Sequence, residues 1–204
     1  RIADRDAVVG VLGLGYVGLP LARRFTEVGF HVLGLDNDPR KVEQLGAGAS
    51  YIEHIPDAAI AEMRAAGFTA TAEMARAREA DALILCVPTP LDRHREPDLS
   101  YVTGTMDAIA PVLRAGQLVS LESTTWPGTT EEVLAPRIEA EGLAVGRDVF
   151  LVYSPEREDP GNTRFTTATM PRVLGGVTDA CLAAGATLYG AAIERIVRLS
   201  SPRA

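Results

Sequence analysis

Short apolar runs alternate with helical patterns along the 204 residues, and this alternation is the strongest constraint on the fold. Runs of strand length lie at Ala7–Leu12, His31–Leu35, Asp81–Val87, Gln117–Leu121 and Val149–Tyr153. Strands that alternate with helices favour a mainly parallel sheet with helices on both faces. The sequence therefore predicts an α/β fold of the Rossmann type, doubly wound.

Weaker patterns complete this prediction. Further strands are expected at Phe68–Thr71, Arg172–Leu174 and Ile193–Leu199. Helices are expected at Val17–Val28, Pro39–Leu45, Asp57–Ala66, Ala72–Arg78, Leu99–Leu113, Thr129–Glu141 and near Thr178–Tyr189. Open parallel sheets bind ligands beyond the carboxyl ends of their strands, so the chemistry is expected in the loops near residues 12, 35, 87, 121 and 153.

Charge and cysteine content exclude several kinds of partner. The formal net charge is −7 and the chain has no basic tract, which argues against nucleic acid and anionic membranes as partners. No apolar run is long enough to span a membrane and no signal peptide is visible, so a cytoplasmic protein is expected. The two cysteines, Cys86 and Cys181, lack metal-ligand spacing, so no metal site is expected and both are interpreted as core residues.

The first expected loop carries a glycine motif, "VLGLGYVGLPLA", with Gly13, Gly15 and Gly18 in the pattern G-x-G-x-x-G. Gly13 permits a tight turn, Gly15 lets the backbone approach a pyrophosphate, and Gly18 lets helix and strand pack closely. The helix N-terminus would then hold the pyrophosphate through its free N–H groups. The motif predicts a dinucleotide site, although a glycine turn that serves packing alone remains the alternative.

The next strand, "HVLGLD", ends in Asp36, whose carboxylate can accept hydrogen bonds from the adenosine ribose. The same negative charge would repel a 2′-phosphate, so NAD is favoured over NADP. FAD is the rival cofactor, and the later loops argue against it.

Those later loops are "CVPTPLDRHREPDLSYV", "LESTTWPGTTEEV", "YSPEREDPGN" and "MPRVLGG". Together with the glycine loop they resemble the N-terminal, NAD-binding domain of the UDP-glucose/GDP-mannose dehydrogenase family. The resemblance runs from about residue 7 to the end of the chain and keeps the order of the motifs.

The resemblance implies oxidation of a sugar C6 hydroxyl to the carboxylate with two NAD, through an aldehyde that a cysteine captures. "YIEHIP", "REPDLS" and "SPEREDPG" resemble members that oxidise UDP-N-acetylhexosamines, and UDP-N-acetylglucosamine above all. UDP-N-acetylmannosamine and UDP-glucose are the alternative substrates. The family also implies a role in polysaccharide precursor biosynthesis and a full-length enzyme that forms a homo-oligomer.

For the cofactor, the resemblance implies roles for five positions beyond the glycines. The backbone of Tyr16 and Val17 would contact NAD at the helix start. Lys41 would lie near the adenosine, with Arg40 as its alternative. Thr89 would line the cofactor trough, and Thr124 would contact NAD.

For the chemistry, the resemblance implies that Glu156 is the acid–base residue and that Thr124 helps to hold a catalytic water. Arg157 and Glu158 would contact the nucleotide sugar. Pro155 and Pro160 restrict the backbone around these charges, which would position the Glu156 carboxylate in advance. The alternative for "EREDP" is a solvated charge cluster on a turn.

The expected domain organisation is a Rossmann domain over residues 1–200, with 201–204 as the start of a linker to a central helix. The family's central and C-terminal domains, with the nucleophilic cysteine and a lysine, would lie outside this chain. We therefore expect the fragment alone to be inactive. A non-catalytic dinucleotide-binding module is the alternative class of function, and the presence of Thr124 and Glu156 favours the enzyme.

Overall fold

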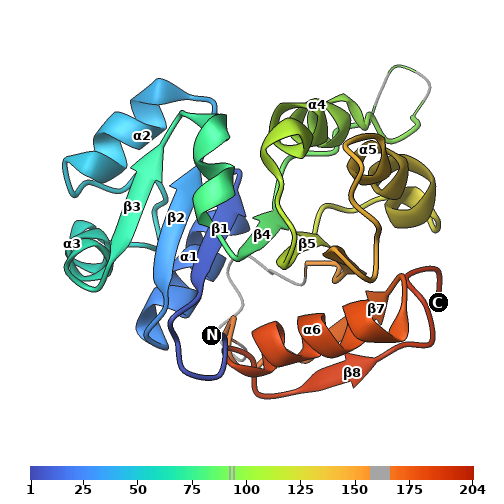
Figure 1. Ribbon diagram of the computed structural model, residues 1–204. Coiled ribbons are helices and arrows are strands. Elements are labelled where there is room, and N and C mark those ends of the chain that lie inside the picture. The colour runs from blue at the N-terminus through green and yellow to red at the C-terminus, as the bar shows by residue number, and fades with distance from the viewer. Residues whose placement is uncertain (92, 94, 157–165) are drawn as a thin grey trace.

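The structure is a computed structural model that describes residues 1–91, 93, 95–156 and 166–204. In this part of the chain, eight strands form one sheet with the order β3-β2-β1-β4-β5-β6-β7-β8 (Figure 1). The strands are β1 (Val8–Leu12), β2 (His31–Leu35), β3 (Phe68–Thr71), β4 (Ala82–Leu85), β5 (Gln117–Leu121), β6 (Val149–Tyr153), β7 (Arg172–Gly176) and β8 (Ile196–Arg198). The predicted Rossmann-type sheet is thus confirmed.

Successive strands are added to the sheet in one direction from β1 to β3 and in the opposite direction from β4 onward, so the strand order reverses between β1 and β4. β1 pairs in parallel with β2 on one side and with β4 on the other, which is the topological switch point at which such sheets bind ligands. β6 pairs antiparallel with β7, and β8 pairs in parallel with β7. The sheet is therefore mainly parallel, with one reversal near its β8 edge.

The five central strands end in one row. Leu12 is paired with Leu35 and with Leu85, Leu85 is paired with Leu121, and Leu121 is paired with Tyr153. The loops that follow these strands consequently start at the same level of the sheet. Residues far apart in the sequence are brought side by side along this edge.

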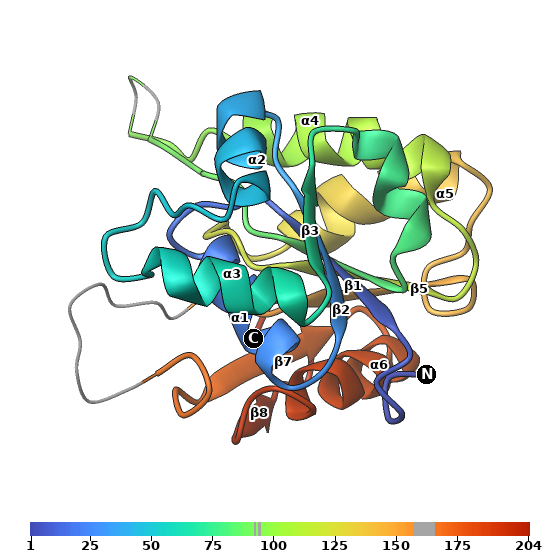
Figure 2. The same cartoon turned by 90° about the vertical axis from the view of Figure 1, so that its left-hand side faces the viewer.

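Helices cover both faces of the sheet, as Figure 2 shows from its β3 edge. The helices are α1 (Gly18–Glu27), α2 (Pro39–Gly46), α3 (Asp57–Ala65), α4 (Ser100–Ile109), α5 (Ala135–Ala140) and α6 (Asp179–Gly190). Buried side chains of α1, α3 and α6 pack in one apolar core, and those of α4 and α5 pack in a second core on the opposite face. Both cores consist mainly of Ala, Val, Leu and Ile, and each large aliphatic side chain buried there contributes about 1.5–3 kcal/mol.

Three predicted helices differ in type from the expectation. Residues Met74–Glu79 form a 3-10 helix, and α4 continues as a 3-10 turn over Ala110–Val112. Residues Thr130–Leu134 form a π-helical turn that leads into α5. Pro136 stands in the first turn of α5 and has no N–H to donate, which breaks the regular hydrogen-bond pattern there.

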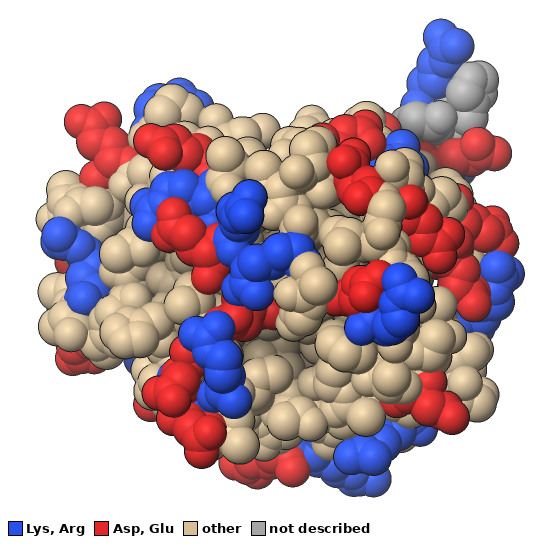
Figure 3. Space-filling model, viewed as in Figure 1, with Lys and Arg blue, Asp and Glu red and all other residues tan. Residues whose placement is uncertain are grey.

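Among the described residues, no helix is long and apolar enough to cross a membrane. On the face shown in Figure 3, acidic and basic side chains are interspersed with uncharged ones.

Candidate dinucleotide site

The glycine loop between β1 and α1 has a shape that two of its glycines make possible. Gly13 has a φ of 89°, and a Cβ atom there would lie 2.7 Å from the carbonyl oxygen of Cys86. A Cβ atom on Gly18 would collide with the Gly13 carbonyl oxygen. These two glycines therefore serve the packing of loop, helix and sheet.

Gly15 differs from them, because a Cβ atom there would meet nothing within 4 Å. Its backbone faces open space at the switch point of the sheet. No side chain caps the N-terminus of α1, whose first residues follow Gly15 and Val17. The uncapped N–H groups and the helix dipole attract an anion, so the loop suits a pyrophosphate.

Asp36 follows β2 and is only 4% exposed. Its Oδ2 accepts hydrogen bonds from the Leu14 N–H at 2.8 Å and from Lys41 Nζ at 3.0 Å. Its Oδ1 accepts one from the Asp38 N–H at 2.9 Å. A carboxylate offers about four acceptor positions, so these bonds fix the orientation of Asp36 and leave capacity for a ribose hydroxyl.

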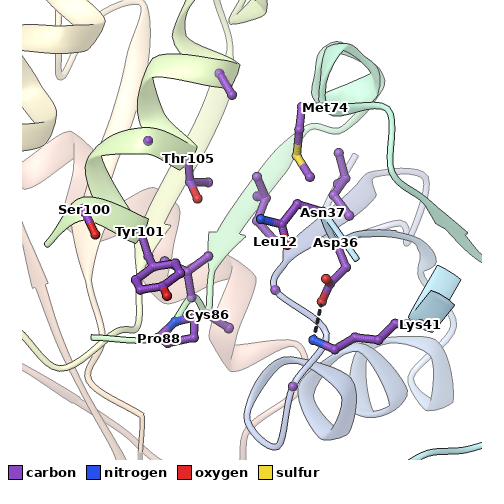
Figure 4. A pocket seen from close by; sticks show the side chains of 16 residues that line it. Leu12, Asp36, Asn37, Lys41, Met74, Cys86, Pro88, Ser100, Tyr101 and Thr105 are labelled. Carbon is purple, nitrogen blue, oxygen red and sulfur yellow. Dashed lines mark hydrogen bonds and ion pairs between the residues drawn. The ribbon is translucent and has the colours of Figure 1, made fainter. Parts of the chain in front are cut away.

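A cleft of about 450 Å³ lies between the carboxyl ends of β1, β2 and β4 and the helix α4. Figure 4 shows Asp36, Asn37 and Lys41 on one wall, and Pro88 and Tyr101 on the other. The lining residues are Leu12, Gly13, Gly15, Leu35, Asp36, Asn37, Lys41, Met74, Cys86, Val87, Pro88, Ser100, Tyr101, Gly104, Thr105 and Ala108. Their mixture of apolar surface with a few polar groups is typical of a site for a nucleoside.

Of the cofactor residues predicted from the sequence, Gly13, Gly15, Asp36 and Lys41 line this cleft. The others lie around it. Tyr16 is 59% exposed, with its ring centroid 6.3 Å from that of His54. Val17 is half-buried at the start of α1, and Gly18 packs against Gly13.

Sequence reasoning missed the wall that α4 contributes. Tyr101, Gly104, Thr105 and Ala108 share one face of this helix, at the spacing of three and four residues that places side chains together. Three of the four are small, whereas the opposite face carries the buried apolar side chains. A helix face of small residues beside a predicted ligand edge is the signal that could have found this wall.

Thr89, predicted to line the cofactor trough, and the predicted catalytic residues Thr124 and Glu156 lie farther along the same edge of the sheet, outside the lining of the cleft. Thr89 is half-buried after β4, Thr124 is exposed after β5, and Glu156 is half-buried after β6. Backbone and side-chain hydrogen bonds tie these loops together. The Glu156 N–H donates to the Glu122 carbonyl at 3.1 Å, and Ser123 Oγ donates to the Val87 carbonyl at 2.6 Å.

Arg157 and Glu158, predicted to contact the sugar, lie outside the described residues.

A buried polar cluster, Ser120, Glu122, Arg172 and Tyr189, lies beneath these loops, and sequence reasoning did not find it. Arg172 Nη1 is 2.6 Å from Glu122 Oε1, and the Tyr189 hydroxyl donates to the same oxygen at 2.6 Å. Tyr189 and Ser120 share a hydrogen bond of 2.8 Å. Burial, and after it the charge of Glu122, raises the pKa of Tyr189, so this hydroxyl keeps its proton.

Burial alone would disfavour the charge of Arg172. The neighbouring Glu122 carboxylate outweighs it, and the pKa of Arg172 lies above its ordinary value. The cluster is therefore a buried ion pair held between Tyr189 of α6 and the strands β5 and β7.

The switch point, the glycine loop and the buried Asp36 together define a dinucleotide-binding domain of the Rossmann class. Comparison with known proteins narrows this class. Residues 7–193 match the model of the UDP-glucose/GDP-mannose dehydrogenase family, NAD binding domain. This chain belongs to that family, and its cofactor is NAD.

Relatives within the family act on different sugars. The UDP-N-acetyl-D-glucosamine 6-dehydrogenase of Pseudomonas aeruginosa is 35% identical over 85% of this chain and 41% of its own length. The UDP-N-acetyl-D-mannosamine dehydrogenase of Escherichia coli K12 is also 35% identical, over 92% of this chain and 46% of its own length. The chain thus spans less than half the length of these relatives.

Solved structures of relatives have the same fold. A UDP-D-ManNAc dehydrogenase from Pyrococcus horikoshii superposes with a TM-score of 0.89 at 33% identity, covering 96% of this chain and 47% of that one. A UDP-N-acetyl-mannosamine dehydrogenase from Staphylococcus aureus gives 0.87 at 32% identity, covering 97% and 48%.

Proposed function

We propose that this chain is the NAD-binding part of a UDP-N-acetylhexosamine 6-dehydrogenase, and that its substrate is UDP-N-acetylglucosamine. The enzyme would oxidise the sugar C6 hydroxyl to the carboxylate with two NAD and so supply a polysaccharide precursor. Residues 1–200 would form the Rossmann domain, and the remaining domains would be supplied by further chain. The cytoplasmic location and the homo-oligomer expected from the sequence stay predictions.

One observation carries this proposal: the loops of Thr124 and Glu156 start level with the NAD cleft and are tied to each other. The bond from the Glu156 N–H to the Glu122 carbonyl joins the loop after β6 to the loop after β5, two residues before Thr124. Pro155 limits the backbone just before Glu156. A module that only sensed NAD would need neither side chain at this place.

The resemblance to the family gives each of these residues a proposed role. NAD, when bound, supplies the hydride acceptor. The glycine loop binds the pyrophosphate and Asp36 orients the adenosine ribose. Glu156 receives the proton of the sugar hydroxyl and later serves the hydrolytic step, and Thr124 helps to hold the water. Arg157 and Glu158 would bind the nucleotide sugar.

The choice of sugar follows from the resemblance of "YIEHIP", "REPDLS" and "SPEREDPG" to enzymes that act on UDP-N-acetylhexosamines. Relatives named for UDP-N-acetyl-D-glucosamine and for UDP-N-acetyl-D-mannosamine are equally similar to the chain, at 35% identity. UDP-N-acetylmannosamine is therefore the first alternative substrate, and UDP-glucose is the second.

The test is an assay of NADH formation by the full-length polypeptide with each of the three UDP-sugars. We expect turnover with UDP-N-acetylglucosamine and two NADH for each sugar consumed. Glu156→Gln should lower kcat by about 100-fold or more, the usual worth of a positioned acid–base residue. Glu139→Gln, on the exposed side of α5, is the matched control and should keep full activity.

The alternative class, a non-catalytic dinucleotide-binding module, makes a different prediction. Such a protein would bind NAD and yet form no NADH from any of the three sugars. The 204-residue chain itself is expected to bind NAD without steady turnover. Steady NADH production by this chain alone would contradict the proposed division of the enzyme.

A further inference from the structure

Leu14 occupies the middle of the glycine loop, between Gly13 and Gly15, and both of its backbone polar groups are bound by side chains from outside the loop. The Leu14 N–H donates to Asp36 Oδ2 at 2.8 Å. The Leu14 carbonyl accepts a hydrogen bond of 2.5 Å from the Tyr51 hydroxyl. Tyr51 belongs to the segment between α2 and α3, well removed from the loop in sequence.

These contacts form a closed ring around the loop. Lys41 Nζ lies 3.0 Å from Asp36 Oδ2 and 5.9 Å from the centroid of the Tyr51 ring. That separation is within the range of a cation–π contact. Asp36, Leu14, Tyr51 and Lys41 therefore hold one another in place.

The geometry of the peptide bond explains why the Leu14 carbonyl matters. The Leu14 C=O and the Gly15 N–H belong to one planar trans peptide unit, so they point in opposite directions. A bond that holds the carbonyl toward Tyr51 directs the Gly15 N–H the other way. Within the described residues this N–H has no hydrogen-bond acceptor, and the space beside Gly15 is open.

Without such a bond the peptide unit would rotate more freely, because it turns about the ψ bond of Leu14 and the φ bond of Gly15, and glycine tolerates a wide range of φ. A hydroxyl donor is dependable here. Burial, and after it the charges of Asp36 and Asp38, raises the pKa of Tyr51 above its ordinary value, so the phenol stays protonated.

We propose that Tyr51 is a positioning residue of the dinucleotide site, which directs the Gly15 N–H toward the pyrophosphate before the cofactor arrives. Tyr51 acts through Leu14 and is absent from the residues that line the cleft. Its contribution is preorganisation: the loop loses less conformational freedom when the pyrophosphate binds. The inference concerns NAD binding and is independent of the sugar that the enzyme oxidises.

The test compares three ligands on the full-length polypeptide. Tyr51→Phe removes only the hydroxyl and keeps the ring beside Lys41. We expect the affinities for NAD and ADP, which both carry a pyrophosphate, to fall roughly three- to tenfold, the worth of one net hydrogen bond. The affinity for adenosine should stay the same, since adenosine contacts the Asp36 side of the cleft and carries no phosphate.

The matched control is Tyr153→Phe, whose hydroxyl makes no hydrogen bond within the described part of the chain. Calorimetry gives the NAD and ADP affinities, and ligand-observed NMR gives that of adenosine. Amide NMR supplies a direct signature: in Tyr51→Phe the Gly15 N–H signal should move, while in Tyr153→Phe it should not.

Two outcomes would overturn the proposal. Unchanged NAD affinity in Tyr51→Phe would show that the loop holds its shape without the hydroxyl. An equal loss for NAD, ADP and adenosine, together with a lower Tm, would show a general structural role. Failure of the sugar-oxidation assay would not affect the conclusion about Tyr51, because the binding measurements use no sugar.

Discussion

Glu122 Oε1 and Arg172 Nη1 form an ion pair 2.6 Å apart inside the protein. Glu122 is 0% exposed and Arg172 is 3% exposed. Glu122 follows β5 and Arg172 begins β7, so the pair connects two strands that flank β6 without pairing with each other. The strand between them, β6, leads to Glu156, and the ion pair therefore stabilises the part of the sheet from which Glu156 extends.

Removing one partner should leave an uncompensated charge in the interior. We expect Arg172→Met to lower the free energy of unfolding by about 3–5 kcal/mol. The double variant Glu122→Gln/Arg172→Met removes both charges and should recover most of that loss. Urea denaturation of the three proteins measures the difference.

The control for this experiment is Arg137→Met, which breaks an exposed ion pair with Asp107 of 2.8 Å. It should change the free energy of unfolding by less than about 1 kcal/mol. Equal destabilisation in the single and the double variant would mean that the loss comes from packing and that the buried charge of Glu122 plays no part.

The glycines of the loop should respond differently to the same added methyl group. Gly15→Ala should leave stability nearly unchanged, because its Cβ atom meets nothing within 4 Å, and should weaken NAD binding by about tenfold or more. Gly18→Ala should destabilise the fold by about 1–3 kcal/mol, because its Cβ atom collides with the Gly13 carbonyl. Thermal unfolding and NAD calorimetry on both variants separate the two effects.

Asp36 should decide between NAD and NADP. Asp36→Ala removes the ribose acceptor and the partner of the Leu14 N–H and of Lys41, so NAD affinity should fall by about tenfold or more. Lys41 would then be free to attract a 2′-phosphate, and the preference for NAD over NADP should shrink. Calorimetry with both cofactors measures this, with Asp107→Asn as an exposed control. An NADP preference in the unaltered protein would contradict the role of Asp36.

The turn before β6 should contribute a pH-dependent part of stability. The guanidinium of Arg147, and after it the Ala144 N–H, lowers the pKa of Asp148 from 3.8 to about 2. Because the folded-state pKa is the lower one, this contribution is complete above about pH 4 and is lost as the pH falls toward 2. Asp148→Asn should remove that part of the pH dependence of unfolding, whereas Asp4→Asn should preserve it.

The fold was largely predictable because its signals are local. The apolar run of β5 and the glycine turn after β1 can each be recognised from a few adjacent residues. The π-helical turn at Thr130–Leu134 was not predictable, because the sequence of this segment has the pattern of an ordinary helix and Pro136 comes only after it.

The candidate site was predictable only in part, for the same reason. Gly13 and Gly15 lie in one short motif and Asp36 ends the next strand, and the structure brings them together at the cleft. The bond from Tyr51 to Leu14 and the pairing of Arg172 with Glu122 depend on contacts between distant segments. Neither leaves a pattern in the sequence around the residues concerned.

The three glycines of the loop are under two different evolutionary constraints, one from folding and one from cofactor binding. Gly13 and Gly18 are required by close contacts with the protein's own backbone, whereas Gly15 is required only by the approach of the cofactor. A homologue that no longer binds the cofactor would still need glycine at positions 13 and 18 to fold, but could carry another residue at position 15. A substitution at position 15 alone would therefore indicate loss of cofactor binding, whereas a substitution at position 13 or 18 would indicate a change in the packing of the loop.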